Sequence, residues 1–89
     1  MKAYEFLDSL EKWCQGGFGK IQEKRCISWT IFSCYGSEHH SVCNVVAKRI
    51  NPEFVSKQAD SGARVCIKWN DAPERTWQEV HDLLKELDI

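Results

Sequence analysis

Apolar residues recur every three or four positions at the two ends of the chain, and this spacing is typical of a helix with one buried face. The first such segment covers residues 2–15, and the three glycines within residues 16–19 favour the end of a helix followed by a turn. We therefore predict an N-terminal helix over residues 2–15. Its apolar positions are Ala3, Leu7, Leu10 and Cys14.

The second helical pattern lies near the C-terminus, and its start carries a capping box. Thr76 and Glu79 have the spacing at which each side chain accepts a hydrogen bond from the other residue's backbone N–H. We predict a helix that begins here and continues almost to the end of the sequence. Its apolar stripe comprises Trp77, Val80, Leu83, Leu84 and Leu87.

Between the two helical patterns, three segments predict strands. The side chains of residues 25–35 and 63–69 alternate between two faces, and residues 42–50 follow a turn as the return strand of a hairpin. Alternation with many β-branched and aromatic residues is typical of strands with one buried face. We therefore predict an α+β fold of order α-β-β-β-α, as a single domain over residues 1–89. In this fold two helices pack on one face of a three-stranded antiparallel sheet.

The opposite face of the predicted sheet is open, and open antiparallel sheet faces are common docking surfaces. The side chains that alternate away from the helices include several cations and one aromatic ring. This face is our candidate binding site, and a solvated, charged sheet face without a partner is an equally good interpretation. The candidate residues are Arg25, Phe32, Lys48, Arg49, Arg64 and Lys68.

Composition places the chain among folded proteins, since 43% of its residues are apolar and 28% are charged. No apolar run approaches the roughly 20 residues that cross a bilayer, and the first residues lack the apolar segment of a signal peptide. Five cysteines, an odd number without paired spacing, favour reduced and buried thiols. These features predict a cytoplasmic protein without membrane association.

Charge is unevenly distributed along the chain. Residues 14–68 contain eight Lys or Arg and four Asp or Glu, whereas residues 69–89 contain two Lys or Arg and six Asp or Glu. We expect the folded protein to present a basic side and an acidic side. The acidic side could occupy a basic groove of another protein in place of a nucleic acid, and ordinary solvated helix faces are the alternative.

Two cysteines and two histidines form the most metal-like cluster, namely Cys34, His39, His40 and Cys43. Thiolates and imidazoles are zinc ligands, and a hairpin turn would bring these side chains together. The spacing matches no recurring zinc pattern, and neighbouring histidines point apart in extended chain, so we expect no metal and no cofactor and keep a zinc-binding domain as the third hypothesis. The cluster also lacks a third group to orient a Cys–His nucleophile, so we expect no enzymatic activity.

The order α-β-β-β-α resembles that of the double-stranded RNA-binding domain over nearly the whole chain. That family places a basic cluster at the start of its last helix, where this sequence has Asn70, Asp71 and Glu74, which would repel phosphates. The family's RNA-binding residues therefore do not carry over. Nucleic-acid binding by the basic sheet face, with Phe32 as a stacking platform, is our second hypothesis.

In size and general architecture the chain also resembles small phage-encoded inhibitors of host defence, such as anti-CRISPR proteins. This resemblance implies docking on a nucleic-acid-handling complex. Together with the missing catalytic constellation and the opposed charges, it leads to our first hypothesis. The chain is a small non-enzymatic module that binds a protein partner, either a single protein or a nucleoprotein complex.

Overall fold

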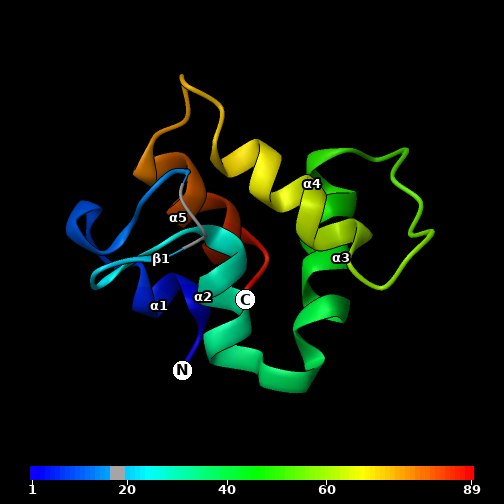
Figure 1. The fold of residues 1–89 in the computed structure, drawn as a ribbon, viewed down its shortest axis with the longest axis horizontal. Helices are drawn as coiled ribbons and strands as arrows, with labels where there is room; N and C mark the ends of the chain where they lie inside the picture. The colour runs from blue at the N-terminus through cyan, green and yellow to red at the C-terminus, as the bar shows by residue number, and fades with distance from the viewer. Residues whose placement is uncertain (17–19) are drawn as a thin grey trace.

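The fold is mostly helical. In a computed structural model, which describes residues 1–16 and 20–89, α-helices and short 3-10 helices pack around one core, and the strands of the described residues form one short antiparallel pair (Figure 1). The predicted α+β fold with a three-stranded sheet is therefore wrong. The elements are α1 (Ala3–Phe6), η1 (Leu10–Lys12), β1 (Lys20–Ile21), β2 (Lys24–Arg25), α2 (Ile27–Tyr35), η2 (Gly36–Glu38), α3 (His39–Ile50), α4 (Ser61–Asn70) and α5 (Trp77–Glu86).

Helix α2 occupies the segment predicted as the first strand. Ile27 and Ile31, one helical turn apart, are fully buried, whereas Trp29 between them is 37% exposed. A strand would place all three side chains on one face, and a helix separates them. The Cys26 sulfur accepts a hydrogen bond from the backbone N–H of Trp29 at 3.4 Å, and the Thr30 hydroxyl donates to the Cys26 carbonyl at 2.8 Å. These local bonds support the first turn of the helix.

Helices α3 and α4 replace the other two predicted strands. In α3 the buried residues Cys43, Val46 and Ala47 have the spacing of one helical face. In α4 the buried residues Gly62 and Cys66 lie one turn apart. The β-branched residues of these segments lower helix propensity by only about 0.5 kcal/mol each. Burial of the two helical faces outweighs that local preference, because tertiary packing supplies most of the stability of helices in proteins.

The N-terminal helix is much shorter than predicted. Helix α1 has a single turn, the 3-10 helix η1 follows, and Trp13 then pairs with Arg25 in an isolated β-bridge. Leu10, which belonged to the predicted buried stripe, is 61% exposed. The predicted glycine turn begins at Gly16, whose φ of +70° lies in the left-handed region that glycine tolerates. Its remaining residues, 17–19, lie outside the described part of the chain.

Helix α5 forms where predicted, and its capping box is confirmed. The Glu79 carboxylate accepts a hydrogen bond from the backbone N–H of Thr76 at 3.0 Å, and the Thr76 hydroxyl accepts one from the backbone N–H of Glu79 at 3.3 Å. After the helix, Asp88 adopts a φ of +56°. The backbone N–H of Ile89 then donates to the carbonyl of Leu84 at 3.0 Å, as in a Schellman motif. This turn directs the Ile89 side chain into the core.

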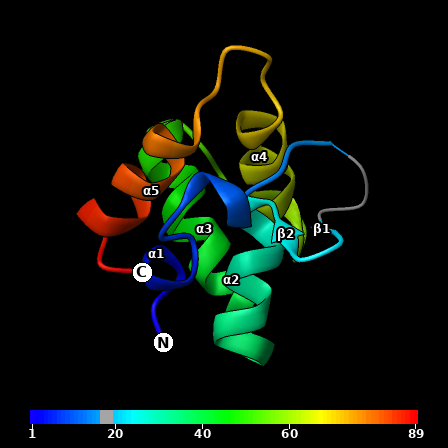
Figure 2. The same ribbon diagram turned by 90° about the vertical axis from the view of Figure 1, so that its left-hand side faces the viewer.

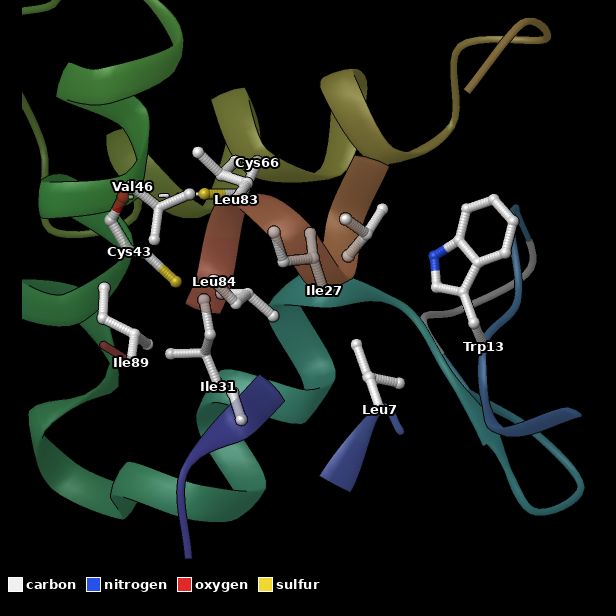
Figure 3. Packing of buried hydrophobic residues seen from close by; sticks show 12 residues of the cluster. Leu7, Trp13, Ile27, Ile31, Cys43, Val46, Cys66, Leu83, Leu84 and Ile89 are labelled. Atoms are coloured by element: carbon white, nitrogen blue, oxygen red, sulfur yellow. Dashed lines mark hydrogen bonds between the residues drawn. The ribbon is translucent and has the colours of Figure 1, made fainter. Parts of the chain in front are cut away.

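The core lies where α2, α3, α4 and α5 meet, with α1 closing one end. Figure 3 shows Ile27 and Ile31 of α2 pointing toward Leu84 of α5. Packing of these residues removes most of the apolar surface from water, which is the main stabilising contribution in a domain of this size. The buried cluster comprises Ala3, Leu7, Trp13, Ile27, Ile31, Cys43, Val46, Cys66, Val80, Leu83, Leu84 and Ile89.

A fully buried asparagine at the end of α4 joins three parts of the chain. Asn70 Oδ1 accepts hydrogen bonds from the indole N–H of Trp13 at 2.8 Å and from the backbone N–H of Ile27 at 3.0 Å. Its Nδ2 donates to the carbonyl of Cys14 at 3.1 Å and to the Asp71 carboxylate at 3.0 Å. The amide therefore uses its two donors and two acceptor positions, so its burial leaves no unpaired polar atom.

Helices α3 and α4 cross at a glycine. A Cβ atom placed on Gly62 would lie 2.7 Å from the backbone nitrogen and 2.8 Å from the Cα of Asn44, and would also clash with Asn44 Oδ1. Real Cβ atoms do not approach backbone this closely, so the crossing needs a residue without a side chain. The glycine sets the distance between the two helices.

The variant Gly62→Ala tests this crossing. In an unobstructed helix the change would stabilise the protein by about 1 kcal/mol. Here we expect it to lower the free energy of unfolding by about 1–3 kcal/mol, because the helices must move apart. Urea denaturation measures the change. Asn44→Ala in the Gly62→Ala background should not restore stability, since the backbone of Asn44 is the obstacle. A stabilised Gly62→Ala variant would contradict the close crossing.

Candidate functional site

The six predicted binding residues do not share one surface, because the sheet that would have aligned them does not exist. The Arg25 guanidinium lies over the ring of Phe6, 4.5 Å from its centroid, and is partly buried there. The other five lie on helices. The structure places Arg25 in β2, Phe32 in α2, Lys48 and Arg49 in α3, and Arg64 and Lys68 in α4.

Two of these cations, Arg49 and Arg64, form ion pairs with carboxylates of the protein itself. Arg49 Nε lies 2.6 Å from the carboxylate of Glu86 in α5, and the hydrogen bond and charge of Glu86 raise the pKa of Arg49. Arg64 Nε lies 2.9 Å from the carboxylate of Asp60, one helical turn earlier. Exposed ion pairs of this kind contribute little stability. They do reduce the positive charge that these two arginines offer to a partner.

The four residues weighed as zinc ligands do not converge. The rings of His39 and His40 lie 4.0 Å apart, contrary to the expectation that they point apart, because both begin a helix instead of extending a strand. The Nδ1–H of His39 donates to the Gly36 carbonyl at 2.8 Å. Cys34 is partly buried on α2, and Cys43 is fully buried in the core. Within the described part of the chain, no group of three or more His, Cys, Asp or Glu side chains could hold a metal ion.

Two buried thiols meet between α3 and α4. The thiol of Cys66 donates a hydrogen bond to the carbonyl of Cys43 at 3.5 Å, and neither side chain is exposed (Figure 3). Hydrogen bonding to Cys43 and burial raise the pKa of Cys66. Burial likewise raises the pKa of Cys26. At neutral pH Cys66 and Cys26 are therefore protonated and act as small core residues.

Thiol labelling of the native protein tests this burial. We expect iodoacetamide at about pH 8 to modify Cys34 before Cys26, Cys43 or Cys66, because only a partly exposed thiolate reacts at an appreciable rate. Burial raises the pKa of Cys34, so its labelling should accelerate as the pH increases toward that raised pKa. Peptide mass spectrometry measures each rate, with protein unfolded in urea as the control. Native labelling of Cys66 as fast as that of Cys34 would contradict the core.

Aromatic rings line the outer side of α2 and reach the start of α3. Trp29 and Phe32 are 37% and 44% exposed, and their ring centroids lie 5.5 Å apart. Phe32 also meets the ring of His39 edge-on at 4.9 Å. Each ring supports the next, so these large side chains are held in place while they face solvent. We call Trp29, Phe32 and His39 the α2 face.

Sequence reasoning found one of the two large rings of the α2 face. Phe32 is among the predicted binding residues, whereas a strand over residues 25–35 would place Trp29 on the same face as Ile27 and Ile31. Ile27 and Ile31 are four residues apart, and Trp29 and Phe32 are three residues apart. These two helical spacings are the signal that separates the buried pair from the exposed pair.

An open groove of about 570 Å³ lies beside the N-terminal segment. Small-molecule sites are usually concave and lined by apolar groups with a few converging polar ones. Here Lys24 is the charged side chain in the described lining, which also includes the buried Cys14. The lining residues are Leu10, Trp13, Cys14, Gln15, Gln22 and Lys24.

The helices differ in the sign of the charged side chains that they carry. Figure 2 shows α2 and α4 on one side and α5 on the opposite side. Helices α2, α3 and α4 contain no Asp or Glu. Their cations are Lys48, Arg49, Arg64 and Lys68, whereas the acidic residues of α5 are Glu79, Asp82 and Glu86.

These features define a small helical protein with an aromatic face on one of its central helices. The chain belongs to a family of unknown function, DUF6197, whose model matches residues 2–87. No curated protein and no solved structure matches the chain. Among the described residues, no helix combines the length and apolar character needed to cross a bilayer.

Proposed function

We propose that this protein is a non-enzymatic binding module that docks on a protein partner through the α2 face. The observation that carries the proposal is the exposed, mutually packed pair of Trp29 and Phe32. Burial of either side chain in the protein's own core would be favourable by about 2–3 kcal/mol. Instead the helix turns both outward, while Ile27 and Ile31 fill the core.

Large aromatic residues that are held in place before binding suit an interface. Trp and Tyr are enriched among the residues that contribute most to protein–protein binding, and an ordered side chain loses less conformational entropy when it is buried. The ring contact with His39 limits the motion of Phe32 on its open side. The α2 face therefore offers a compact apolar centre for a partner.

One sequence-based hypothesis and two family resemblances lose their structural basis. Nucleic-acid binding was assigned to a basic sheet face, and that face does not exist because its residues lie on separate helices. The resemblances to the double-stranded RNA-binding domain and to phage-encoded inhibitors used the order α-β-β-β-α, which is wrong. The phage-inhibitor resemblance now rests on chain length alone. A cytoplasmic location stays an expectation from the sequence, and the proposal does not depend on it.

Truncation of the two aromatic side chains tests the proposal. We expect the double variant Trp29→Ala, Phe32→Ala to lose partner binding by at least about tenfold, since truncated aromatic anchors typically cost about 2 kcal/mol or more. Circular dichroism should show an unchanged helical fold, because both side chains are partly exposed. Quantitative co-purification from nuclease-treated lysate of the native host measures the binding.

The matched control is Leu10→Ala, which truncates an apolar side chain that is 61% exposed but lies on η1, away from the α2 face. It should retain the partners of the wild-type protein. An unchanged partner set in the folded double variant would show that binding, if any, uses another surface.

A further inference from the structure

We propose that the segment bound by the α2 face is an acidic amphipathic helix, with apolar side chains on one side and Asp or Glu beside them. This inference rests on the proposed function and names the chemistry of the partner. It is carried by the charges and apolar side chains of the helices that surround the α2 face.

The first observation is the absence of carboxylates from the helices around the α2 face. Helices α2, α3 and α4 contain no Asp or Glu and pack against one another in all three pairs. The nearest acidic residues along the chain are Glu38, which ends η2 directly before His39, and Glu53 and Asp60 between α3 and α4. A basic partner segment would therefore find no carboxylate on these helices, whereas an acidic one meets their lysines.

The second observation is that α4, which packs against α2 (Figure 2), carries an exposed apolar side chain and an available cation. Ile67 is 41% exposed. Lys68 beside it is exposed and forms no ion pair with the described residues, unlike Arg64 one turn earlier. The attraction between Lys68 and a partner carboxylate is therefore not offset by breaking an internal pair.

The third observation concerns the kind of macromolecule. Bases of a single-stranded nucleic acid stack on aromatic rings, and binding needs several cations along the phosphate backbone. Here two helices that contact α2 add exposed aliphatic side chains, Ile67 on α4 and Val45 on α3. Two of the four helix cations are bound to Glu86 and Asp60. This surface fits the mixed apolar and acidic side chains of a protein helix better than a phosphate backbone.

Selection from a library of random peptides tests the inference with the complete protein. Peptides of about 15 residues, or four helical turns, are displayed on phage and selected on the wild-type protein. Those that also bind the Trp29→Ala, Phe32→Ala variant are removed. We expect the retained sequences to have net negative charge and apolar residues three or four positions apart. No charge bias, or a basic bias, would overturn the inference and leave the proposed function in place.

Synthetic peptides then quantify the charge dependence by fluorescence anisotropy. A selected peptide should bind at least about tenfold more tightly than its twin in which Asp and Glu are replaced by Lys, and its affinity should fall as salt increases. The variant Lys68→Glu should bind the acidic peptide more weakly and the basic twin more tightly than the wild type does. Lys57→Glu, in the loop before α4, is the control that makes the same change of charge elsewhere. Equal affinity of the two twins would overturn the inference.

Two further results would remove the proposed function as well. If counter-selection on the folded double variant removes every peptide that binds the wild type, the α2 face is not the docking site. If labelled single-stranded RNA binds the wild type tightly and loses affinity in the double variant, the same face binds nucleic acid instead of an acidic helix. Weak RNA binding that the double variant does not change is consistent with the proposal.

Discussion

The buried amide of Asn70 is the constraint on which the arrangement of the helices depends. Its hydrogen bonds join the C-terminal end of α4 to the indole of Trp13, to the carbonyl of Cys14 and to the first backbone N–H of α2. A hydrogen bond adds only about 1 kcal/mol net, but an unpaired buried donor or acceptor costs about 1–3 kcal/mol. The four bonds therefore favour one arrangement of these segments over packings that would leave any of them unmade. Gln15 strengthens the same junction by donating to the carbonyls of Asn70 and Ala72.

This junction also positions the proposed docking surface. Asn70 accepts a hydrogen bond from the backbone N–H of Ile27, the first residue of α2. This bond fixes the start of α2 and therefore the rotation of the helix about its axis. With Ile27 and Ile31 directed into the core, the 3.6-residue helical repeat turns Trp29 and Phe32 toward solvent. The aromatic face is thus a geometric consequence of the core contacts. Its exposure, together with the lack of carboxylates on the adjacent helices, connects the fold to binding.

The parts of the fold that could be predicted are those that local chemistry determines. The capping box of Thr76 and Glu79 and the stripe after it identified α5, since both signals lie within one helix. The segment of α2 was misassigned because Ile27, Trp29 and Ile31 satisfy strand alternation as well as helical spacing. The β-branched and aromatic residues of this segment favour a strand by propensity, but burial of Ile27 and Ile31 in the core stabilises a helix. No local signal reveals that Asn70 is buried, because its partners other than Asp71 lie 43 to 57 residues away along the chain. For the candidate site, Phe32 could be predicted from its residue type, but its neighbours depend on the helix rotation that Asn70 helps to set.

Hydrogen exchange of the tryptophan indoles, followed by NMR, tests the central claim most directly. The account predicts that the indole N–H of Trp13, which donates to the buried Asn70, exchanges only through large-scale opening of the fold. The indole N–H of Trp29, which has no hydrogen-bond partner among the described residues and lies on a side chain 37% exposed, should exchange far faster and serves as the internal reference. Comparable exchange rates for the two indoles in the native protein would contradict both the buried junction and the outward rotation of α2.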